Sequence, residues 1–265
     1  MTEVRQKRRT AGLDDTMSRP GPAARAVQAV VERAEELNLR CSAVDNPPVY
    51  ANDVLPWSRE IEAEWWRIRR ELDGIMQWKD ALPAFHQIAS DVSAISADQS
   101  WKTFLLCGYG RRSEEAIRRC PETWRSLRKV PGLKSAMFSI FEPGKHLAPH
   151  RGPYNGVLRF HLGLIVPERA DRVGIRIADE VHRRREGEAL IFDDAYEHEA
   201  WNHSEEVRVV VFVDVEKPTR FPARLTNKAV LELALFTPFV PEGYQAQKAW
   251  EKLAYGAEPD RKSVV

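Results

Sequence analysis

Apolar positions recur at helical spacing through much of the first half of the chain. Between residues 23 and 37 this spacing predicts a short amphipathic helix. A stronger helix is predicted after Ser58, which can cap its N-terminus. Five apolar residues there step by three or four positions and so share one face: Ile61, Trp65, Ile68, Leu72 and Ile75. A further helix is predicted over Ser113–Leu127, where a serine precedes two glutamates near the positive end of the helix dipole.

From Lys134 the period changes to two, which is typical of strands. The predicted strands are Ala136–Phe141, Val157–Val166, Val173–Ala178, Ala189–Phe192, Glu197–Asn202 and Val207–Val215. Short breaks rich in Pro, Gly and charge separate them, and no helical pattern lies between them. This arrangement predicts an antiparallel sandwich or barrel with the helices packed outside. Beyond Arg220 the pattern becomes helical again.

Alternation along a strand assigns its residues to two faces, and in two of these strands one face carries charge. Arg159 and His161 share a face of Val157–Val166, opposite a face made only of Leu and Phe. Arg208 lies opposite the odd-numbered valines of Val207–Val215. Buried cations need polar or charged partners. If both strands line the interior of a small barrel, these three side chains converge on a cavity that favours an anion.

Composition narrows the class of protein without naming a partner. The chain has 265 residues with 40 Lys and Arg against 39 Asp and Glu, so a net charge of +1 provides no global field for nucleic acid or an anionic membrane. Hydrophobic residues make up 43% and charged residues 30%, which is typical of a globular protein. Eight Trp residues favour either an aromatic-walled pocket or a bulky core. We therefore expect a single domain with tails and no nucleic-acid partner.

Targeting and redox features predict a cytoplasmic protein. The three cysteines have no metal-ligand spacing and are odd in number, which argues against a disulfide framework. The basic N-terminal stretch lacks the apolar segment of a secretory signal. The apolar run Ala229–Val240 holds 12 residues, whereas a membrane span needs about 20. We expect a packed C-terminal helix there and no transmembrane segment; peripheral membrane contact stays open as an alternative.

Two histidines stand where strands would meet at a barrel mouth. His150 is expected to open a strand, and His198 follows 48 residues later. Imidazole pairs suit Fe, Zn, Cu or Ni. The common non-haem iron site adds a carboxylate two residues after the first His, but that position holds Gly152. Spacing alone leaves open a structural role for each histidine.

Three blocks in a fixed order carry a resemblance to a known family. They are FSIFEPGKHLAPHRGPYNGVLRFHLGLIVP, GEALIFDDAYEHEAWN and VRVVVFVDVEKP, within a similarity that runs from about Trp57 to Pro218. The sequence resembles the aspartyl/asparaginyl β-hydroxylase family of Fe(II)- and 2-oxoglutarate-dependent oxygenases, bacterial type. The resemblance implies a double-stranded β-helix (jelly roll, cupin-like) core in a mainly β protein with flanking helices. We expect an oxygenase domain over residues 46–218, after a partly disordered tail and short helix (1–45) and before a helical extension (219–265).

The resemblance also implies the roles of eight residues. His150 and His198 would bind Fe(II), and a glycine at position 152 is a trait of this family. Asp194 would orient a metal-bound water. The 2-oxoglutarate pocket carries over to a set of five residues. They are Trp101, Ser139, Arg159, His161 and Arg208. Arg208 would bind the distal carboxylate and Ser139 would donate its hydroxyl to it.

The implied reaction is hydroxylation of an unactivated C–H with O2, coupled to decarboxylation of 2-oxoglutarate to succinate. We expect the substrate to be the β-carbon of an aspartyl or asparaginyl group, free, carrier-bound or in a peptide. One alternative is a lipid acyl chain, as in the lipid A acyl-chain hydroxylases that this bacterial group includes. A rival of another class is a non-catalytic jelly roll that senses a metal or a dicarboxylate.

Overall fold

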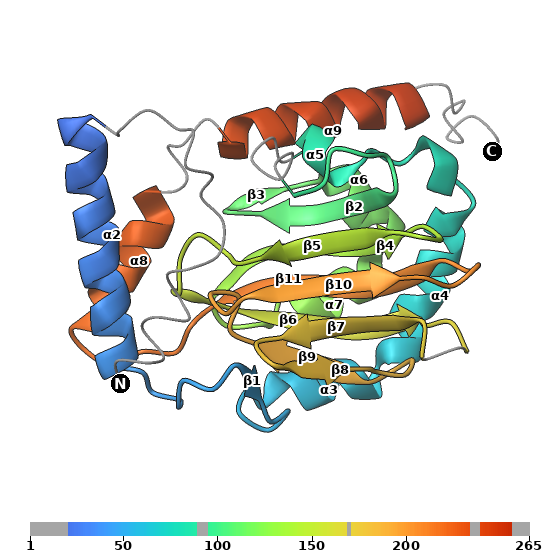
Figure 1. Ribbon diagram of the computed structural model, residues 1–265. Helices are drawn as coiled ribbons and strands as arrows, with labels where there is room; N and C mark the ends of the chain where they lie inside the picture. The colour runs from blue at the N-terminus through green and yellow to red at the C-terminus, as the bar shows by residue number, and fades with distance from the viewer. Residues whose placement is uncertain (1–20, 89–94, 169–170, 234–238, 256–265) are drawn as a thin grey trace.

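The computed structural model of the protein describes residues 21–88, 95–168, 171–233 and 239–255 (Figure 1). The helices are α2 (Pro22–Arg40), α3 (Trp57–Ala63), α4 (Trp65–Met76), a 3-10 turn (Lys79–Ala81), α5 (Phe85–Ile88), α6 (Glu114–Arg119), α7 (Pro121–Leu127), α8 (Ala223–Leu233) and α9 (Phe239–Tyr255). The strands are β1 (Val49–Tyr50), β2 (Trp101–Gly108), β3 (Arg111–Arg112), β4 (Leu133–Phe141), β5 (His146–His150), β6 (Val157–Ile165), β7 (Val173–Ile177), β8 (Glu180–His182), β9 (Ala189–Phe192), β10 (His198–Asn202) and β11 (Arg208–Glu216).

The strands form two antiparallel sheets. The larger sheet has the order β1-β9-β6-β11-β4-β2-β3, and the smaller has the order β5-β10-β7-β8. From β4 to β7, and again from β9 to β11, successive strands belong alternately to the larger and the smaller sheet. The larger-sheet strands β4, β6, β9 and β11 therefore face the smaller-sheet strands β5, β7, β8 and β10. This is the double-stranded β-helix arrangement, with helices around it, and it confirms the predicted fold class.

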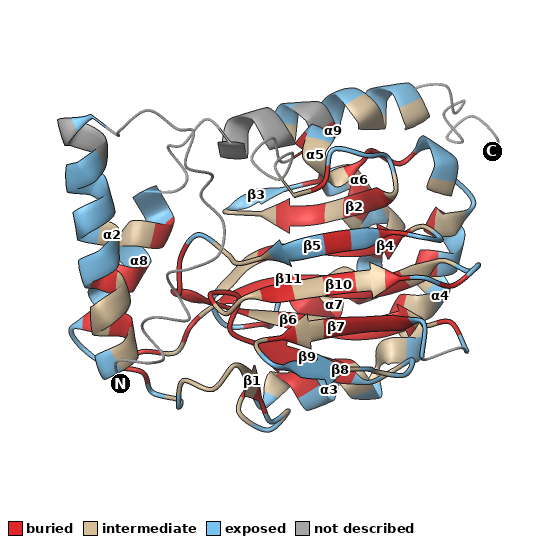
Figure 2. Ribbon diagram, in the orientation of Figure 1, coloured by how far each residue is buried: buried red, intermediate tan, exposed pale blue. Residues whose placement is uncertain are grey.

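The main core lies between the larger sheet and the helices, not between the two sheets. Leu158, Phe160 and Leu162 of β6 and the odd-numbered valines of β11 pack there against α4. Figure 2 shows buried or half-buried residues along most strands, with exposed stretches on β3, β5 and β8. The opposite faces of β6 and β11 therefore point toward the smaller sheet, where a separate apolar cluster forms around Phe192. The predicted parity of both strands is confirmed, and their charged face lies inside the jelly roll.

Two helices that the sequence predicts as continuous are each broken into two. The first breaks at Glu64, whose carboxylate accepts a hydrogen bond from the Ser126 hydroxyl of α7 at 2.7 Å. Ser58 is not its N-cap; that position is Pro56, and Ser58 is buried inside α3. The second breaks before Pro121, which has no N–H to donate and begins α7 instead. Its predicted start is confirmed, because the Ser113 hydroxyl accepts from the Ala116 N–H at 2.9 Å.

The sequence patterns missed several strands and reversed the position of one histidine. Strands β1, β2, β3, β5 and β8 have no counterpart among the six predicted strands. His150 ends β5 and does not open a strand, because Arg151, Gly152 and Pro153 follow it as a turn. Pro149 is tolerated inside β5 because this strand is the edge of its sheet.

Two helices that are far apart in the sequence pack together beside the sheets. Helix α2 contacts α8 (Figure 1), and both lie next to the end of the jelly roll where β5 stops. The predicted disordered tail lies almost entirely outside the described residues. The run Ala229–Val240 spans the end of α8 and the start of α9, and residues 234–238 between them are also outside the described part. Among the helices of the described residues, none combines the length and the hydropathy that a membrane crossing requires.

Candidate functional site

Strand register arranges the inward side chains of the larger sheet in rows across β2, β4, β11 and β6. One row runs Trp101, Phe141, Arg208, and the next includes Thr103, Ser139 and Val210. The third row is Leu105, Met137, Phe212, His161, and the fourth is Gly108, Ser135, Asp214, Arg159. Residues in neighbouring strands of a row lie about 4.7–4.9 Å apart along the hydrogen-bonding direction. Five residues predicted for one cosubstrate pocket therefore lie on one inner face.

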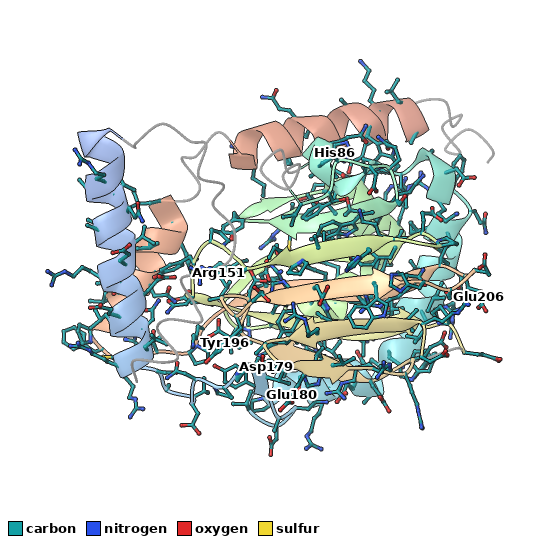
Figure 3. All side chains as sticks on the ribbon, in the orientation of Figure 1. His86, Arg151, Asp179, Glu180, Tyr196 and Glu206 are labelled. Atoms are coloured by element: carbon teal, nitrogen blue, oxygen red, sulfur yellow. The ribbon has the colours of Figure 1, made fainter. Side chains whose placement is uncertain are left out.

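The two predicted metal ligands stand opposite each other on the smaller sheet. His198 at the start of β10 pairs in register with His150 at the end of β5, and their ring centroids are 4.2 Å apart. Figure 3 labels Arg151, just after His150, and Tyr196, just before His198, at the same end of the sheets. The pairing of β5 with β10 thus brings together two imidazoles that are 48 residues apart in the sequence.

Backbone hydrogen bonds fix which ring nitrogen of each histidine is free. His150 Nδ1 lies 2.8 Å from the carbonyl oxygen of Ala148, and His198 Nδ1 lies 2.9 Å from that of Tyr196. A carbonyl only accepts, so each Nδ1 carries the proton and each Nε2 keeps a lone pair. Burial, with the nearby His150, lowers the pKa of His198 well below its ordinary value, which keeps this ring neutral. Neutral imidazoles with free Nε2 atoms are the form that binds metal ions.

Asp194 occupies the space that a side chain at position 152 would need. A Cβ built on Gly152 would lie 1.9 Å from Asp194 Oδ2, and the Gly152 N–H donates to the Asp194 carbonyl at 2.8 Å. Asp194 Oδ1 lies 3.4 Å from His198 Nε2. Two lone-pair atoms face each other there, which favours a cation or a bound water between them. The glycine is therefore explained by the carboxylate that fills its place.

If His150 and His198 bind Fe(II) as predicted, Gly152→Ala should weaken that binding by about 10- to 100-fold, the usual effect of disturbing groups that orient metal ligands. The added methyl group must displace the Asp194 carboxylate. Fe(II) affinity under anaerobic conditions measures the effect. The control is Gly74→Ala on α4, where a Cβ meets nothing within 4 Å. Equal Fe(II) affinity in Gly152→Ala and the control would contradict the role given to this contact.

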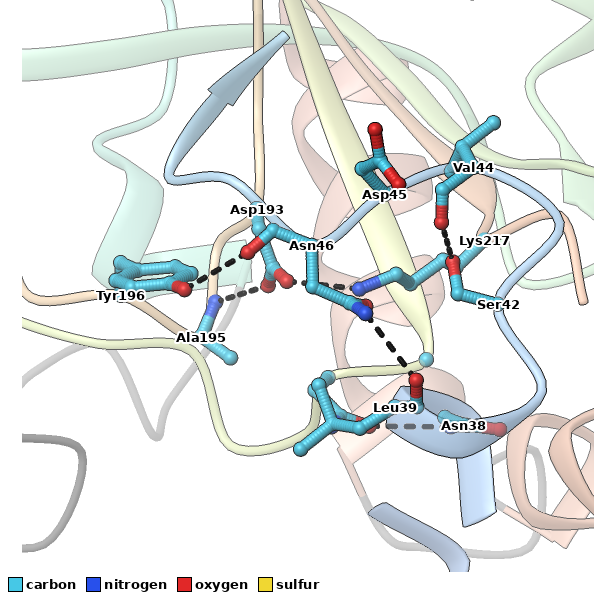
Figure 4. Close-up of polar contacts among 12 residues, drawn as sticks. Asn38, Leu39, Ser42, Val44, Asp45, Asn46, Asp193, Ala195, Tyr196 and Lys217 are labelled. Atoms are coloured by element: carbon cyan, nitrogen blue, oxygen red, sulfur yellow. Dashed lines mark hydrogen bonds and ion pairs between the residues drawn. The ribbon is translucent and has the colours of Figure 1, made fainter. Parts of the chain in front are cut away.

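A buried ion pair anchors the loop that carries Asp194. Lys217 Nζ contacts Asp193 Oδ2 at 2.9 Å, and both side chains are fully buried. Asp193 also accepts from the Ala195 N–H at 3.0 Å, and the Tyr196 hydroxyl donates to the Asn46 carbonyl at 2.9 Å (Figure 4). These contacts tie the loop between β9 and β10 to β11 and to the segment before β1. The position of Asp194 and His198 is thus set by a rigid neighbourhood.

Arg208 and His161 form a polar end of the interior. Among the described residues no carboxylate pairs with Arg208, whose guanidinium lies 5.5 Å from the Phe141 ring centroid. Burial lowers the pKa of Arg208 to about 10. Both ring nitrogens of His161 are buried without a hydrogen-bond partner. Burial, together with Arg159 and Arg208, lowers the pKa of His161 well below its ordinary value. Such unsatisfied groups fit a bound anion.

Trp101 and Ser139 complete the same wall. The Trp101 indole N–H donates to the Ser139 hydroxyl at 2.9 Å, and both residues are buried. Since the hydroxyl accepts from Trp101, its own proton remains available for an acceptor in the cavity. Trp101 also stacks edge-on against Phe141. The contact therefore holds the Ser139 hydroxyl in place at the cavity wall.

Arg159 has a different environment from Arg208. Its Nε donates to Asp214 Oδ1 at 2.9 Å, its Nη2 to Asp214 Oδ2 at 3.3 Å, and its Nη1 to Asp194. Burial alone would lower the pKa of Arg159, but the two carboxylates outweigh it and raise the pKa. Its charge is thus balanced by protein groups. The register sets Asp214 of β11 beside Arg159 on the neighbouring strand β6.

Seven of the eight predicted site residues line one narrow cavity between the sheets. They are Trp101, Ser139, His150, Arg159, His161, His198 and Arg208. Asp194 lines a larger cavity that shares Trp101, His150 and Arg159 with the first. Sequence reasoning missed the apolar residues of the third row, Leu105, Met137 and Phe212. Only the pairing of β2 with β4 reveals that they are contiguous.

The comparisons with known proteins agree with this geometry. The model of the family described as Aspartyl/Asparaginyl beta-hydroxylase matches residues 62–218. A Rhizobium tropici protein named ornithine lipid ester-linked acyl 2-hydroxylase is 53% identical over 246 residues, which are 93% of this chain and 87% of that protein. The human aspartyl/asparaginyl beta-hydroxylase is 35% identical over 169 residues, which are 62% of this chain and 21% of that protein.

Likeness to solved structures is weaker. A prolyl-4-hydroxylase from Pseudomonas putida overlaps 58% of this chain and 87% of its own, with a TM-score of 0.37 and 12% identity. Overlap at this level carries no argument about function.

Proposed function

The chain belongs to the aspartyl/asparaginyl β-hydroxylase family, and we propose that it is an Fe(II)- and 2-oxoglutarate-dependent dioxygenase that hydroxylates the acyl chain of a lipid. The observation that carries the cofactor assignment is that His150, His198 and Arg208 line one cavity, and that no carboxylate among the described residues pairs with Arg208. The family and its relatives support a hydroxylase; the iron, the cosubstrate and the lipid are the proposal.

The residues present fit the proposed cofactors. His150 and His198 would hold Fe(II) through Nε2, which the hydrogen bonds of Nδ1 leave free. 2-Oxoglutarate is a dianion, and Arg208, with which no carboxylate among the described residues pairs, can bind a carboxylate bidentately. The buried ring nitrogens of His161 and the hydroxyl of Ser139 lie along the same cavity. Bound there, iron and 2-oxoglutarate supply the activation of O2 and the oxidation of an unactivated C–H.

The protein groups orient the reactants and keep water out. Arg208 and Ser139 would fix one end of the dianion, so that its other end points toward the histidine pair. Asp194, held by Arg159 and by the Gly152 contact, would accept a hydrogen bond from a water beside His198. The walls of Phe141, Phe192 and Phe212 lower the local dielectric constant, which strengthens these contacts.

The length of the sequence matches favours a lipid substrate, whereas the sequence motifs by themselves lead us to expect an aspartyl substrate. The match to the Rhizobium acyl hydroxylase spans 93% of this chain, well beyond the residues 62–218 that the family model covers. The human aspartyl/asparaginyl enzyme matches 62% of the chain. Specificity in a shared fold commonly resides in peripheral segments. Because this chain matches the Rhizobium acyl hydroxylase in its peripheral segments as well, we favour an acyl chain as the substrate.

Succinate formation across a substrate panel tests the proposal. The purified protein receives Fe(II), 2-oxoglutarate and O2 with an ester-linked acyl lipid, a lipid lacking that ester, L-aspartate, or an aspartyl peptide. We expect succinate above background only with the ester-linked lipid, and hydroxylated acyl chains in equal amount. Succinate formation only with L-aspartate or the aspartyl peptide would favour the aspartyl substrate instead. Binding of metal and 2-oxoglutarate with no turnover of any substrate would favour the sensor.

A further inference from the structure

A large apolar cavity opens beside the histidine pair. Its volume is about 370 Å³, within the roughly 300–1,000 Å³ of pockets that hold organic ligands. One end is formed by His150, Gly152 and Asp194. The other end lies under α5 and the first part of α9, beside β2 and β3. The cavity therefore connects the proposed metal site with the edge of the larger sheet.

An apolar row crosses this cavity from the site to the sheet edge. Phe212, Met137 and Leu105 stand in register on β11, β4 and β2, next to His161 of the cosubstrate pocket. They form an apolar cluster separate from the main core, with Phe85 of α5 packed against it. Two strand spacings separate β11 from β2, or about 10 Å. A linear apolar ligand can therefore lie across the strands with one end near the histidines.

Helix α5 continues this surface past the sheet edge. Phe85 contacts the Trp101 ring at 4.4 Å between centroids, and Ile88 is buried beside it. Ile95 lines the same cavity. Contact with these apolar side chains would exclude water from the methylene groups of a ligand and so favour its binding. The shape and chemistry fit an extended hydrocarbon chain.

The charged side chains that line the cavity either balance one another or lie near its ends. Arg159, which also lines the cavity, is balanced by Asp194 and Asp214. Arg151 lines the cavity beside His150, while Arg111 and Arg112 are exposed at the other end, on β3. An acyl lipid oxidised close to its ester would place that ester and its head group near Arg151, and its tail along the apolar row.

From this arrangement we infer that the cavity is the binding site for the substrate's acyl chain, with Leu105 and Ile95 limiting the length of chain that it accepts. The inference rests on the proposed lipid function for its substrate and adds the place and direction of the chain. It makes Leu105 and Ile95 specificity-determining residues that touch neither iron nor 2-oxoglutarate.

Fatty-acid binding to the metal-free protein tests this inference. A fluorescent hexadecanoic acid analogue is the probe, and unlabelled hexadecanoic and octanoic acids compete for it. In Leu105→Trp and Ile95→Trp, we expect hexadecanoic acid to bind about tenfold more weakly, as expected from losing the burial of about two methylene groups, while octanoic acid changes little. Leu225→Trp on the exposed face of α8 is the matched control and should bind both acids as wild type does.

The outcomes distinguish a failure of this inference from a failure of the proposed function. Thermal unfolding checks the fold of each variant, and either tryptophan variant alone suffices if the other does not fold. Equal binding of hexadecanoic acid by wild type and a folded tryptophan variant would overturn the inference, as would absence of binding to wild type. Since the binding assay contains no iron, chain-selective binding by a protein that forms no succinate would refute the proposed function and leave the cavity assignment standing.

Discussion

Arg208→Ala should weaken 2-oxoglutarate binding by about 30-fold to several thousand-fold while changing Fe(II) binding little. Removing one partner of a buried, hydrogen-bonded charge pair costs roughly 2–5 kcal/mol, which corresponds to that range of affinity. The large value is expected because no carboxylate among the described residues shares this cation with the ligand. Anaerobic titration of the Fe(II)-loaded protein with 2-oxoglutarate, followed by the visible charge-transfer band, measures the constant.

Two further variants sharpen the test of Arg208. Arg208→Lys keeps the charge but loses the bidentate fork, so its affinity should lie between those of wild type and Arg208→Ala. Arg128→Ala is the control, because Arg128 is exposed beyond the end of α7. If Arg208→Ala binds 2-oxoglutarate as tightly as the control does, Arg208 has no part in holding the cosubstrate.

His198→Ala should lower Fe(II) affinity by more than the roughly 10- to 100-fold that disturbing an orienting group costs, because it removes one of two protein ligands. The charge-transfer band should be absent at Fe(II) concentrations that saturate wild type. His203→Ala is the matched control, an exposed histidine just beyond the same strand. A band of unchanged intensity in His198→Ala would place the metal elsewhere.

Alternation along single strands predicted much of this interior. Arg159, His161 and Arg208 could be placed on one face because a strand's period of two is local, and the opposite faces of β6 and β11 are uniformly apolar. The division of roles between the two arginines could not be predicted. Whether a cation is paired depends on cross-strand register, which sets Asp214 beside Arg159 and leaves Phe141 beside Arg208.

The metal site shows the same limit. The sequence offered His150 and His198 but no reason for Gly152, apart from the family resemblance. The structure provides the reason, because the Asp194 carboxylate reaches back over the loop into that space. Likewise, β2 was not predicted as a strand, since apolar residues lie on both of its faces and obscure the alternation. Without β2, the apolar row that crosses the sheet could not be seen.

The choice between lipid and amino-acid substrates depends on these same features. The carboxylate of an aspartyl substrate near the metal would need a cation to bind, whereas Arg159 is already balanced by two carboxylates and the wall toward β2 is apolar. The cavity volume suits an extended chain better than an aspartyl side chain. Both observations agree with the near full-length match to an acyl hydroxylase.

Incorporation of isotopically labelled O2 is the most direct test of the central proposal. The protein is incubated with Fe(II), 2-oxoglutarate, labelled O2 and an ester-linked acyl lipid, and the acyl chains are released and analysed by mass spectrometry. We predict one labelled oxygen atom on the acyl chain for each succinate formed, and none with His198→Ala. Succinate formed without label in the acyl chain, or no succinate at all, would contradict an acyl hydroxylase built on this site.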